Sequence, residues 1–196
     1  MNKRSHLLVT GKIAEQIPEK GRNWFLFGSI LPDLLYHTYW KGHMFESSFE
    51  SISKKICELE KHGRDNRFSY LILGYILHYV EDFYTLAHNP VFEGSLPSHI
   101  LYERQLEEYL KEEDRFPENE NDSVMSLDAT LQYLRDEHKE YLKEAGNFET
   151  DKKYIYNVSQ VVSKCLLRAF AMNEQESQEP EGVLIYMFPD YHKVRL

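Results

Sequence analysis

The chain has 196 residues and a mass of 23.4 kDa, enough for one domain with a sizeable buried core. Its net charge is −9, and its lysines and arginines form no cluster interleaved with aromatic residues, which argues against a nucleic-acid partner or an anionic membrane surface. The two distant cysteines, Cys57 and Cys165, form no disulfide framework and no apolar segment is long enough to span a membrane, so we expect a cytoplasmic protein with no stable membrane anchor.

A helix is predicted near the start of the chain, capped by Ser5 and closed by Pro18. Its apolar residues recur at helical spacing, at Leu7, Leu8, Ile13 and Ile17. His6 lies in the first turn, where a histidine taken alone is most simply an ordinary, partly exposed side chain. A functional interpretation of His6 therefore depends on other parts of the chain.

The next segment, 21–35, is aromatic and apolar, and its pattern is interrupted at Pro32 and Asp33. The residue before a proline disfavours the helical conformation, so we expect a joint here, from which the carboxylate of Asp33 points into a cavity. Aspartate is also a common helix cap, and the local sequence leaves both interpretations open. A cluster follows that either belongs to the core or lines a pocket for a cationic or apolar group; its members are Tyr36, His37, Tyr39, Trp40, His43 and Phe45.

Two helices joined by a loop rich in proline, glycine and serine carry the densest set of potential metal ligands in the chain, His78, Asp82, His88, His99 and Glu103. At about 100° per residue, His78 and Asp82 lie about 40° apart on one helix face, whereas His88 comes about 80° to the other side of His78. On the second helix, His99 and Glu103 are again four residues apart. We therefore expect one site at His78 and Asp82 and a neighbouring one at His88, His99 and Glu103.

The first of these two helices is apolar on nearly all sides, because of Leu71, Ile72, Leu73, Ile76, Leu77, Val80 and Phe83. A histidine and an aspartate four residues apart are often no more than a hydrogen-bonded pair, in solvent or in the core. A helix with this composition should be buried, however, and buried histidine and aspartate must be paired or must coordinate a metal. Imidazole and carboxylate ligands without thiolate suit zinc, with iron and manganese as alternatives.

Further helices are expected at 46–62, 124–145 and 150–172. An acidic surface loop is expected at 111–123, between the helix that carries His99 and Glu103 and the helix at 124–145. His138 belongs to a polar face and is predicted to lie at the surface. We expect an all-α, multi-helix single domain at 1–173 with a metal cluster in its core, followed by a tail at 174–196 that docks back onto the domain. The sequence does not indicate an oligomeric state.

Taken together, the pattern resembles the zinc-dependent phospholipase C family, whose superfamily also contains the zinc nucleases specific for single strands. The resemblance extends from Ser5 to about Glu103 and implies an all-helical protein with a cluster of three zinc ions. Eight positions match in order, at His6, Asp33, His43, His78, Asp82, His88, His99 and Glu103. His37 remains a rival to His43, because the interval between Asp33 and His43 is short.

The ligand sets implied by the resemblance are Asp33, His43, His78 and Asp82 for one zinc, His88, His99 and Glu103 for a second, and His6 with a bridging Asp82 for a third. In secreted members of the family, the amine and carbonyl of an N-terminal tryptophan complete the third site. Here Met1 stands five residues before His6, so a cluster of two ions and a cluster of three both remain open. A closing glutamate, here Glu103, is typical of the phospholipases, whereas the nucleases usually have aspartate.

The expected chemistry is phospholipase C-like hydrolysis of a phosphodiester, in which water activated by clustered ions about 3.5–4 Å apart attacks phosphorus. Asp33 is the expected general base or metal-positioning carboxylate, and the expected contacts to the head group are Tyr36, Tyr39 and Trp40. The substrate would be a small phosphoester or a phospholipid, with nucleic acid not favoured. The alternatives are a nuclease or nucleotidase on the same fold and a non-catalytic metal-binding helical protein.

Overall fold

The computed structural model of the protein describes residues 1–35, 43–112 and 124–176. Within these ranges the chain forms α-helices and two short 3-10 helices without a strand, so the prediction of an all-α fold is confirmed. The α-helices are α1 (Lys3–Ile13), α2 (Glu19–Leu34), α4 (Phe45–His62), α5 (Arg67–Phe83), α6 (Leu96–Glu112), α7 (Leu127–Glu144) and α8 (Phe148–Glu176), and the 3-10 helices are η1 (Ala14–Gln16) and η2 (Leu86–His88). None of the helices in the described ranges combines the length and the apolar content needed to cross a membrane.

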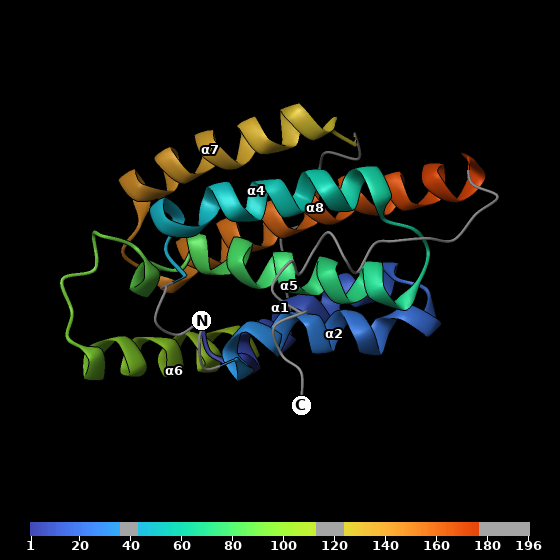
Figure 1. The fold of residues 1–196 in the computed structure, drawn as a ribbon. Helices are drawn as coiled ribbons and strands as arrows, with labels where there is room; N and C mark the ends of the chain where they lie inside the picture. Colours follow the sequence, from blue (N-terminus) through green and yellow to red (C-terminus); the bar gives the residue numbers. More distant parts are fainter. Residues whose placement is uncertain (36–42, 113–123, 177–196) are drawn as a thin grey trace.

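Helix α5 lies at the centre of the fold, with α4, α7 and α8 on one side and α1, α2 and α6 on the other (Figure 1). It packs directly against α2, α4 and α8. The side chain of Asn66 caps its first turn by accepting hydrogen bonds from the backbone N–H groups of Phe68 and Ser69, each at 3.0 Å. Thirteen of its 17 residues are buried. The prediction that this ligand-bearing helix is buried on nearly all sides is therefore confirmed.

Two glycines allow α2 and α5 to pack unusually closely. A Cβ atom at Gly28 would lie 2.0 Å from a carbonyl oxygen of α5, and one at Gly74 would lie 2.1 Å from a carbonyl oxygen of α2. Because both of these oxygens belong to the backbone, a side chain at either position would force the two helices apart. The close contact places Ser29 beside His78, whose Nδ1 donates a hydrogen bond to the carbonyl oxygen of Ser29 at 2.8 Å.

Two predicted features of the first helices differ in the structure. Asn2, rather than Ser5, caps α1, its side-chain oxygen accepting from two backbone N–H groups of the first turn at 3.0 Å. Helix α2 is not interrupted at Pro32 but continues beyond it. A proline in the last turn removes a single hydrogen bond near the helix end, so its cost there is small. Asp33 is therefore helical rather than at a joint, although its side chain does line a cavity as expected.

The turn after α5 corrects the predicted placement of His88. The helix ends at Phe83, so His88 is not part of it and its predicted direction on the same helix is wrong. The side-chain amide of Asn89 donates to the carbonyl oxygens of Phe83 at 3.0 Å and Thr85 at 2.8 Å, which closes the end of α5. The tight turn returns η2 toward α5, so that Nε2 of His88 lies 3.6 Å from Oδ1 of Asp82.

His138 is buried, contrary to the prediction that it lies at the surface. Its side chain stacks on Phe45 with ring centroids 3.8 Å apart, and its Nε2 donates to Oδ1 of Asn89 at 2.9 Å. The residue lies four positions after Leu134 and three before Tyr141, which share the buried face of α7. This spacing was present in the sequence and identifies His138 as a core residue. Burial lowers the pKa of His138 to about 4.

Acidification is expected to destabilise the protein through His138. The unfolded chain binds a proton at this histidine below about pH 6.5, whereas the folded chain does so only near pH 4. The stability contributed by the neutral ring is therefore complete above pH 6.5 and is lost as the pH falls toward 4. In urea unfolding with excess chelator, His138→Gln should lose about 2 kcal/mol less than the unmodified chain between pH 7.5 and 5.0. Glutamine keeps a donor for Asn89, and equal losses in the two proteins would contradict the prediction.

Several predictions fall on residues outside the described ranges. Tyr36, His37, Tyr39 and Trp40 are among them, so their proposed contacts and the rivalry between His37 and His43 remain predictions. Helix α8 extends to Glu176, four residues beyond its predicted end. Residues 177–196 are not described, so the division of the chain at 173 and the docking of the tail also remain predictions.

Candidate metal centre

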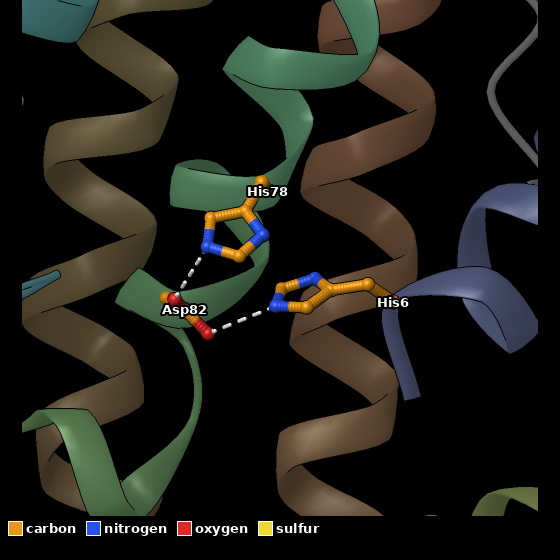
Figure 2. Close-up of side chains that lie close together, drawn as sticks. All are labelled: His6, His78 and Asp82. Atoms are coloured by element: carbon orange, nitrogen blue, oxygen red, sulfur yellow. Dashed lines mark ion pairs between the residues drawn. The ribbon is translucent and has the colours of Figure 1, made fainter. Parts of the chain in front are cut away.

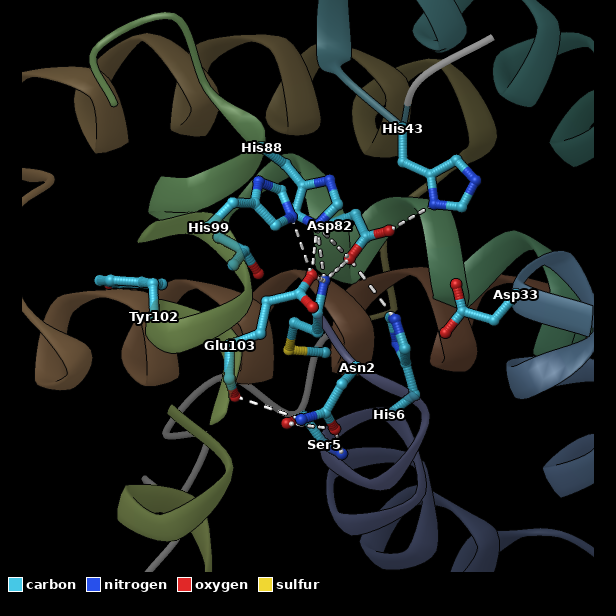
Figure 3. A network of polar contacts seen from close by, with 12 residues as sticks. Asn2, Ser5, His6, Asp33, His43, Asp82, His88, His99, Tyr102 and Glu103 are labelled. Carbon is cyan, nitrogen blue, oxygen red and sulfur yellow. Dashed lines mark hydrogen bonds and ion pairs between the residues drawn. The ribbon is translucent and has the colours of Figure 1, made fainter. Parts of the chain in front are cut away.

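The predicted ligands, which lie on several helices and the segments between them, converge on one region. Three groups have potential ligand atoms within 4.8 Å of one another, namely His6, His78 and Asp82; Asp33, His43 and His78; and His88, His99 and Glu103. Figure 2 shows His6, His78 and Asp82, and Figure 3 shows the wider network around Asp82. Every predicted ligand in the described part of the chain belongs to at least one set, although the residues come from α1, α2, the segment before α4, α5, η2 and α6.

The group between α2 and α5 has the spacing of a zinc shell. Oδ2 of Asp82 lies 2.8 Å from Nδ1 of His43 and 3.4 Å from Nε2 of His78. Nε2 of His78 in turn lies 3.1 Å from Nδ1 of His43 and 3.7 Å from Oδ1 of Asp33. Four ligands at 2.0–2.1 Å from a tetrahedral zinc ion would lie about 3.3–3.4 Å from one another. These four residues, which we call the first group, therefore fit one zinc ion.

The second group is formed by η2 and α6. Oε1 of Glu103 lies 3.0 Å from Nε2 of His88 and 3.1 Å from Nε2 of His99. All three side chains line a cavity, so the space in front of them is accessible. Three protein ligands with a fourth position free for water or substrate are the usual arrangement of a catalytic zinc site.

Asp82 connects the first group to the other ligands. Its Oδ1 lies 3.4 Å from Nε2 of His6 and 3.6 Å from Nε2 of His88, while its Oδ2 faces the first group. The amine of Met1 forms an ion pair with the same Oδ1 and lies 2.8 Å from Nε2 of His88 and 3.4 Å from Oε1 of Glu103. A positive charge is thus held between His6 and the second group, at a point where acceptor atoms converge from three elements.

The ring nitrogens that face this region have the lone pairs that a metal requires. Nδ1 of His78 donates to the carbonyl oxygen of Ser29, so Nε2 of His78 is left as an acceptor that faces the other members of the first group. Nε2 of His6 is buried and has no hydrogen-bond partner among the described residues. A buried acceptor without a partner costs about 1–3 kcal/mol, and coordination of a cation would remove that cost. The donor set therefore fits zinc at this second point as well.

The electrostatic environment also favours a cation. Burial alone would raise the pKa of Asp82, but His88, the amine of Met1 and His6 hold it well below its usual range. Burial alone would lower the pKa of His6, but Asp82 and Glu81 raise it to about 9. This shift indicates a strongly negative local potential, which favours a positive charge at Nε2 of His6, either a proton or a metal ion in its place. Divalent cations are the strongest counter-charges that such a site can bind.

The centre opens into a cavity of about 700 Å³. Five predicted ligands line it, namely Asp33, His43, His88, His99 and Glu103. Exposed basic side chains at its wall come from Lys3, Arg4 and Arg104, and apolar ones come from Met44, Leu96 and Ile100. The described wall of the cavity therefore combines cationic and apolar surface beside the candidate metal ligands.

Asp151 of α8 helps to position the second group, a role that was not predicted from the sequence. Its Oδ2 accepts hydrogen bonds from the backbone N–H of Leu86 at 3.0 Å and from the hydroxyl of Tyr102 at 2.9 Å, and its Oδ1 accepts from the hydroxyl of Tyr141 at 2.7 Å. Leu86 begins η2, and Tyr102 precedes the glutamate of the second group on α6. An aspartate in the first turn of a helix looks like an ordinary capping residue, which is why the pattern alone did not single it out.

Replacing Asp151 with leucine is expected to weaken zinc binding by the second group. The elements that carry its ligands would lose their shared anchor, and loss of an outer partner typically costs about 10–100-fold in metal affinity. Asp151→Asn should retain most of the affinity, because its amide still accepts from Leu86 and the hydroxyl of Tyr141 can rotate to accept. Competition with a zinc chelator measures the effect, with circular dichroism as the test of folding. Unchanged zinc affinity in a folded Asp151→Leu protein would contradict this role.

Comparison with known proteins agrees with this geometry. A family model described as zinc dependent phospholipase C matches residues 5–148, which is well over half of the chain and includes all eight predicted ligands. No curated protein and no solved structure matches the chain. The zinc dependence in the family's description agrees with the three ligand groups. The chain therefore belongs to the zinc-dependent phospholipase C family, which is a family of hydrolases.

Proposed function

We propose that this protein is a zinc-dependent phosphodiesterase that acts on a phospholipid or a small phosphoester. Family membership supports zinc-dependent phosphoester hydrolysis at the level of the family. The observation that carries the proposal for this chain is the position of Asp82, whose two oxygens face different ligand groups. In the proposed assignment, Asp33, His43, His78 and Asp82 hold one ion, His88, His99 and Glu103 hold a second, and His6 with Asp82 holds a third.

Zinc bound in such a cluster activates water at neutral pH and stabilises the charge that develops on a phosphoryl group and its leaving oxygen. Asp33 is the carboxylate that we assign to proton transfer. It lines the cavity, and its Oδ1 lies 3.7 Å from Nε2 of His78. Burial raises the pKa of Asp33, which makes it a better proton acceptor than an exposed aspartate. The same side chain can contribute an oxygen to the first ion.

The cavity wall supports a substrate with an anionic head and an apolar part. Lys3, Arg4 and Arg104 supply positive charge beside the second group, and Leu96 and Ile100 supply exposed apolar surface at the same opening. A phosphodiester carries the negative charge, and an acyl chain or another apolar group would contact the leucine and the isoleucine. The proposed substrate class is therefore a phospholipid or a phosphoester with an apolar substituent.

Removing one ligand of the second group tests the proposal. His99→Ala is expected to lose one zinc ion per chain and at least about 100-fold in hydrolysis of phospholipid vesicles and of bis(4-nitrophenyl) phosphate, because one ion that stabilises the reacting phosphoryl group is absent. His62→Ala, which changes a histidine at the end of α4, should keep the zinc content and rate of the unmodified chain. Elemental analysis gives the ion count.

The same assay separates the proposal from its alternatives. Hydrolysis of single-stranded nucleic acid or of mononucleotides, without action on lipid or on the synthetic diester, would replace the proposal with a nuclease or nucleotidase. Zinc bound at full stoichiometry with no hydrolysis of any of these substrates would indicate a non-catalytic metal-binding protein. Less than about half an equivalent of zinc after reconstitution would overturn the metal-dependent function altogether.

A further inference from the structure

We propose that Glu81 is a positioning residue for a third zinc ion, acting through His6. The proposal rests on the proposed function, because it assumes that the centre binds zinc. Glu81 precedes the bridging Asp82 on α5, and its side chain is wholly buried. It belongs to none of the three ligand groups. A wholly buried carboxylate requires a partner, and the partner in this structure is the imidazole of His6.

The contact between Glu81 and His6 is a hydrogen bond and leaves no room for an ion. Oε2 of Glu81 lies 2.5 Å from Nδ1 of His6, and neither side chain is exposed to solvent. Two ligands of one zinc ion would lie about 3.3–3.4 Å apart, so a metal does not fit between these atoms. An ionised carboxylate can only accept, so Nδ1 of His6 carries a hydrogen, and Nε2 is the nitrogen left to bind a metal ion.

The opposite nitrogen of His6 is the one that faces the centre. Nε2 lies 3.4 Å from Oδ1 of Asp82, the spacing of two ligands on one ion, and has no hydrogen-bond partner among the described residues. The ring also stacks on His78, with centroids 4.0 Å apart and an angle of 26° between the planes. Glu81 and Asp82 thus act on opposite ends of one imidazole, the first by a hydrogen bond and the second across the position assigned to the ion.

This arrangement also explains the negative charge of Glu81, which belongs to none of the three ligand groups. Oε1 of Glu81 has no hydrogen-bond partner within the described part of the chain, so the contact with His6 satisfies only one of the two carboxylate oxygens. A dication on the far side of the ring would supply positive charge to this carboxylate through His6. Histidine ligands of zinc commonly donate their second nitrogen to a carboxylate in this way, which fixes the ring and raises its basicity. We therefore assign Glu81 to this role.

The test compares ion-by-ion zinc affinity in four proteins. These are the unmodified chain, Glu81→Gln, Glu81→Leu and Leu73→Ala, the last of which removes a buried side chain from the same helix as a control for lost stability. Zinc content is followed during chelator competition, and cobalt is substituted so that its visible absorption reports the coordination of each ion. The Nδ1–H proton of His6 is followed by NMR in the zinc-loaded protein, and its signal is assigned by its absence in His6→Gln.

The expected result is a selective loss. Glu81→Leu should weaken one of three ions by about 10–100-fold and remove the hydrogen-bonded Nδ1–H signal, while the other two ions keep their affinity. Glu81→Gln keeps an acceptor for Nδ1 and should restore most of the affinity of that ion. Leu73→Ala should lower stability without a selective effect on one ion.

The inference would be overturned by three ions bound equally in Glu81→Leu and in the unmodified chain. Equal weakening of every ion in Glu81→Leu, with no recovery in Glu81→Gln, would also overturn it, because the role would then be structural. Two ions in the unmodified chain that are indifferent to Glu81 would overturn the inference and leave the proposed phosphodiesterase intact. Absence of bound zinc would overturn both.

Discussion

Asp82→Asn is expected to remove at least one zinc ion per chain and to lower phosphodiester hydrolysis by more than the roughly 10–100-fold that loss of an outer-shell partner costs. The asparagine side chain has the same shape but carries no charge and only one oxygen. Oδ2 of Asp82 lies 2.8 Å from Nδ1 of His43, and its Oδ1 lies 3.4 Å from Nε2 of His6. One amide group cannot present an acceptor to both sides, so either the first group or the third position loses its bridging ligand.

The measurement is zinc per chain together with the rate on a synthetic diester, after purification without added metal and again after reconstitution. Asp136→Asn is the matched control, because its carboxylate lies on the exposed face of α7, where it pairs with Lys139. This variant should match the unmodified chain in both quantities. Full zinc content and full activity in Asp82→Asn would contradict the bridging role and, with it, the proposed assignment of ligands.

Gly74→Ala is expected to reduce the free energy of unfolding by about 1–3 kcal/mol and to weaken zinc binding by the first group. The added Cβ would lie 2.1 Å from a backbone oxygen and 2.8 Å from the backbone nitrogen of Ser29, so α2 and α5 must separate. Separation moves the carbonyl oxygen of Ser29 away from Nδ1 of His78 and moves Asp33 away from its neighbours. Packing between the two helices and ligand geometry should therefore change together.

Gly11→Ala in α1 is the control for this prediction. Among the described residues, no atom outside the adjacent residues and the backbone of α1 lies within 4 Å of the position that its Cβ would take, and alanine favours the helix over glycine by about 0.5–1 kcal/mol. Chemical denaturation should show unchanged or slightly increased stability for Gly11→Ala, and zinc titration should show no change. A Gly74→Ala protein that is as stable as the unmodified chain would mean that the two helices are not held at the separation described here.

The sequence was most informative where a single pattern controlled both the fold and the site. The apolar residues around His78 and Asp82 identified α5 as a buried helix, and burial made coordination the most economical explanation of its polar side chains. Candidate ligands four residues apart, such as His99 and Glu103, keep their relation within any helix, so local spacing correctly predicted that these two side chains lie together.

The sequence was less informative where the geometry depends on contacts between elements. The direction of His88 is set by a turn that Asn89 closes, and helical spacing cannot describe a helix that has already ended. The contribution of Asp151 depends on three elements that lie far apart in the chain. The sequence assigned no role to Glu81, because its contact with His6 depends on the packing of α1.

The link between the first turn of the chain and α6 has a consequence for biosynthesis. The side-chain amide of Asn2 donates to the carbonyl oxygen of Glu103 at 3.3 Å and to Oε2 of Glu107 at 2.9 Å. These pairs are separated by 101 and 105 residues. At translation rates of about 5–20 residues per second, α1 emerges from the ribosome roughly 5–20 s before its partner helix. His6 must therefore wait for the carboxylates of α5 and for the candidate ligands of α6, so the proposed zinc sites would be completed only late in synthesis.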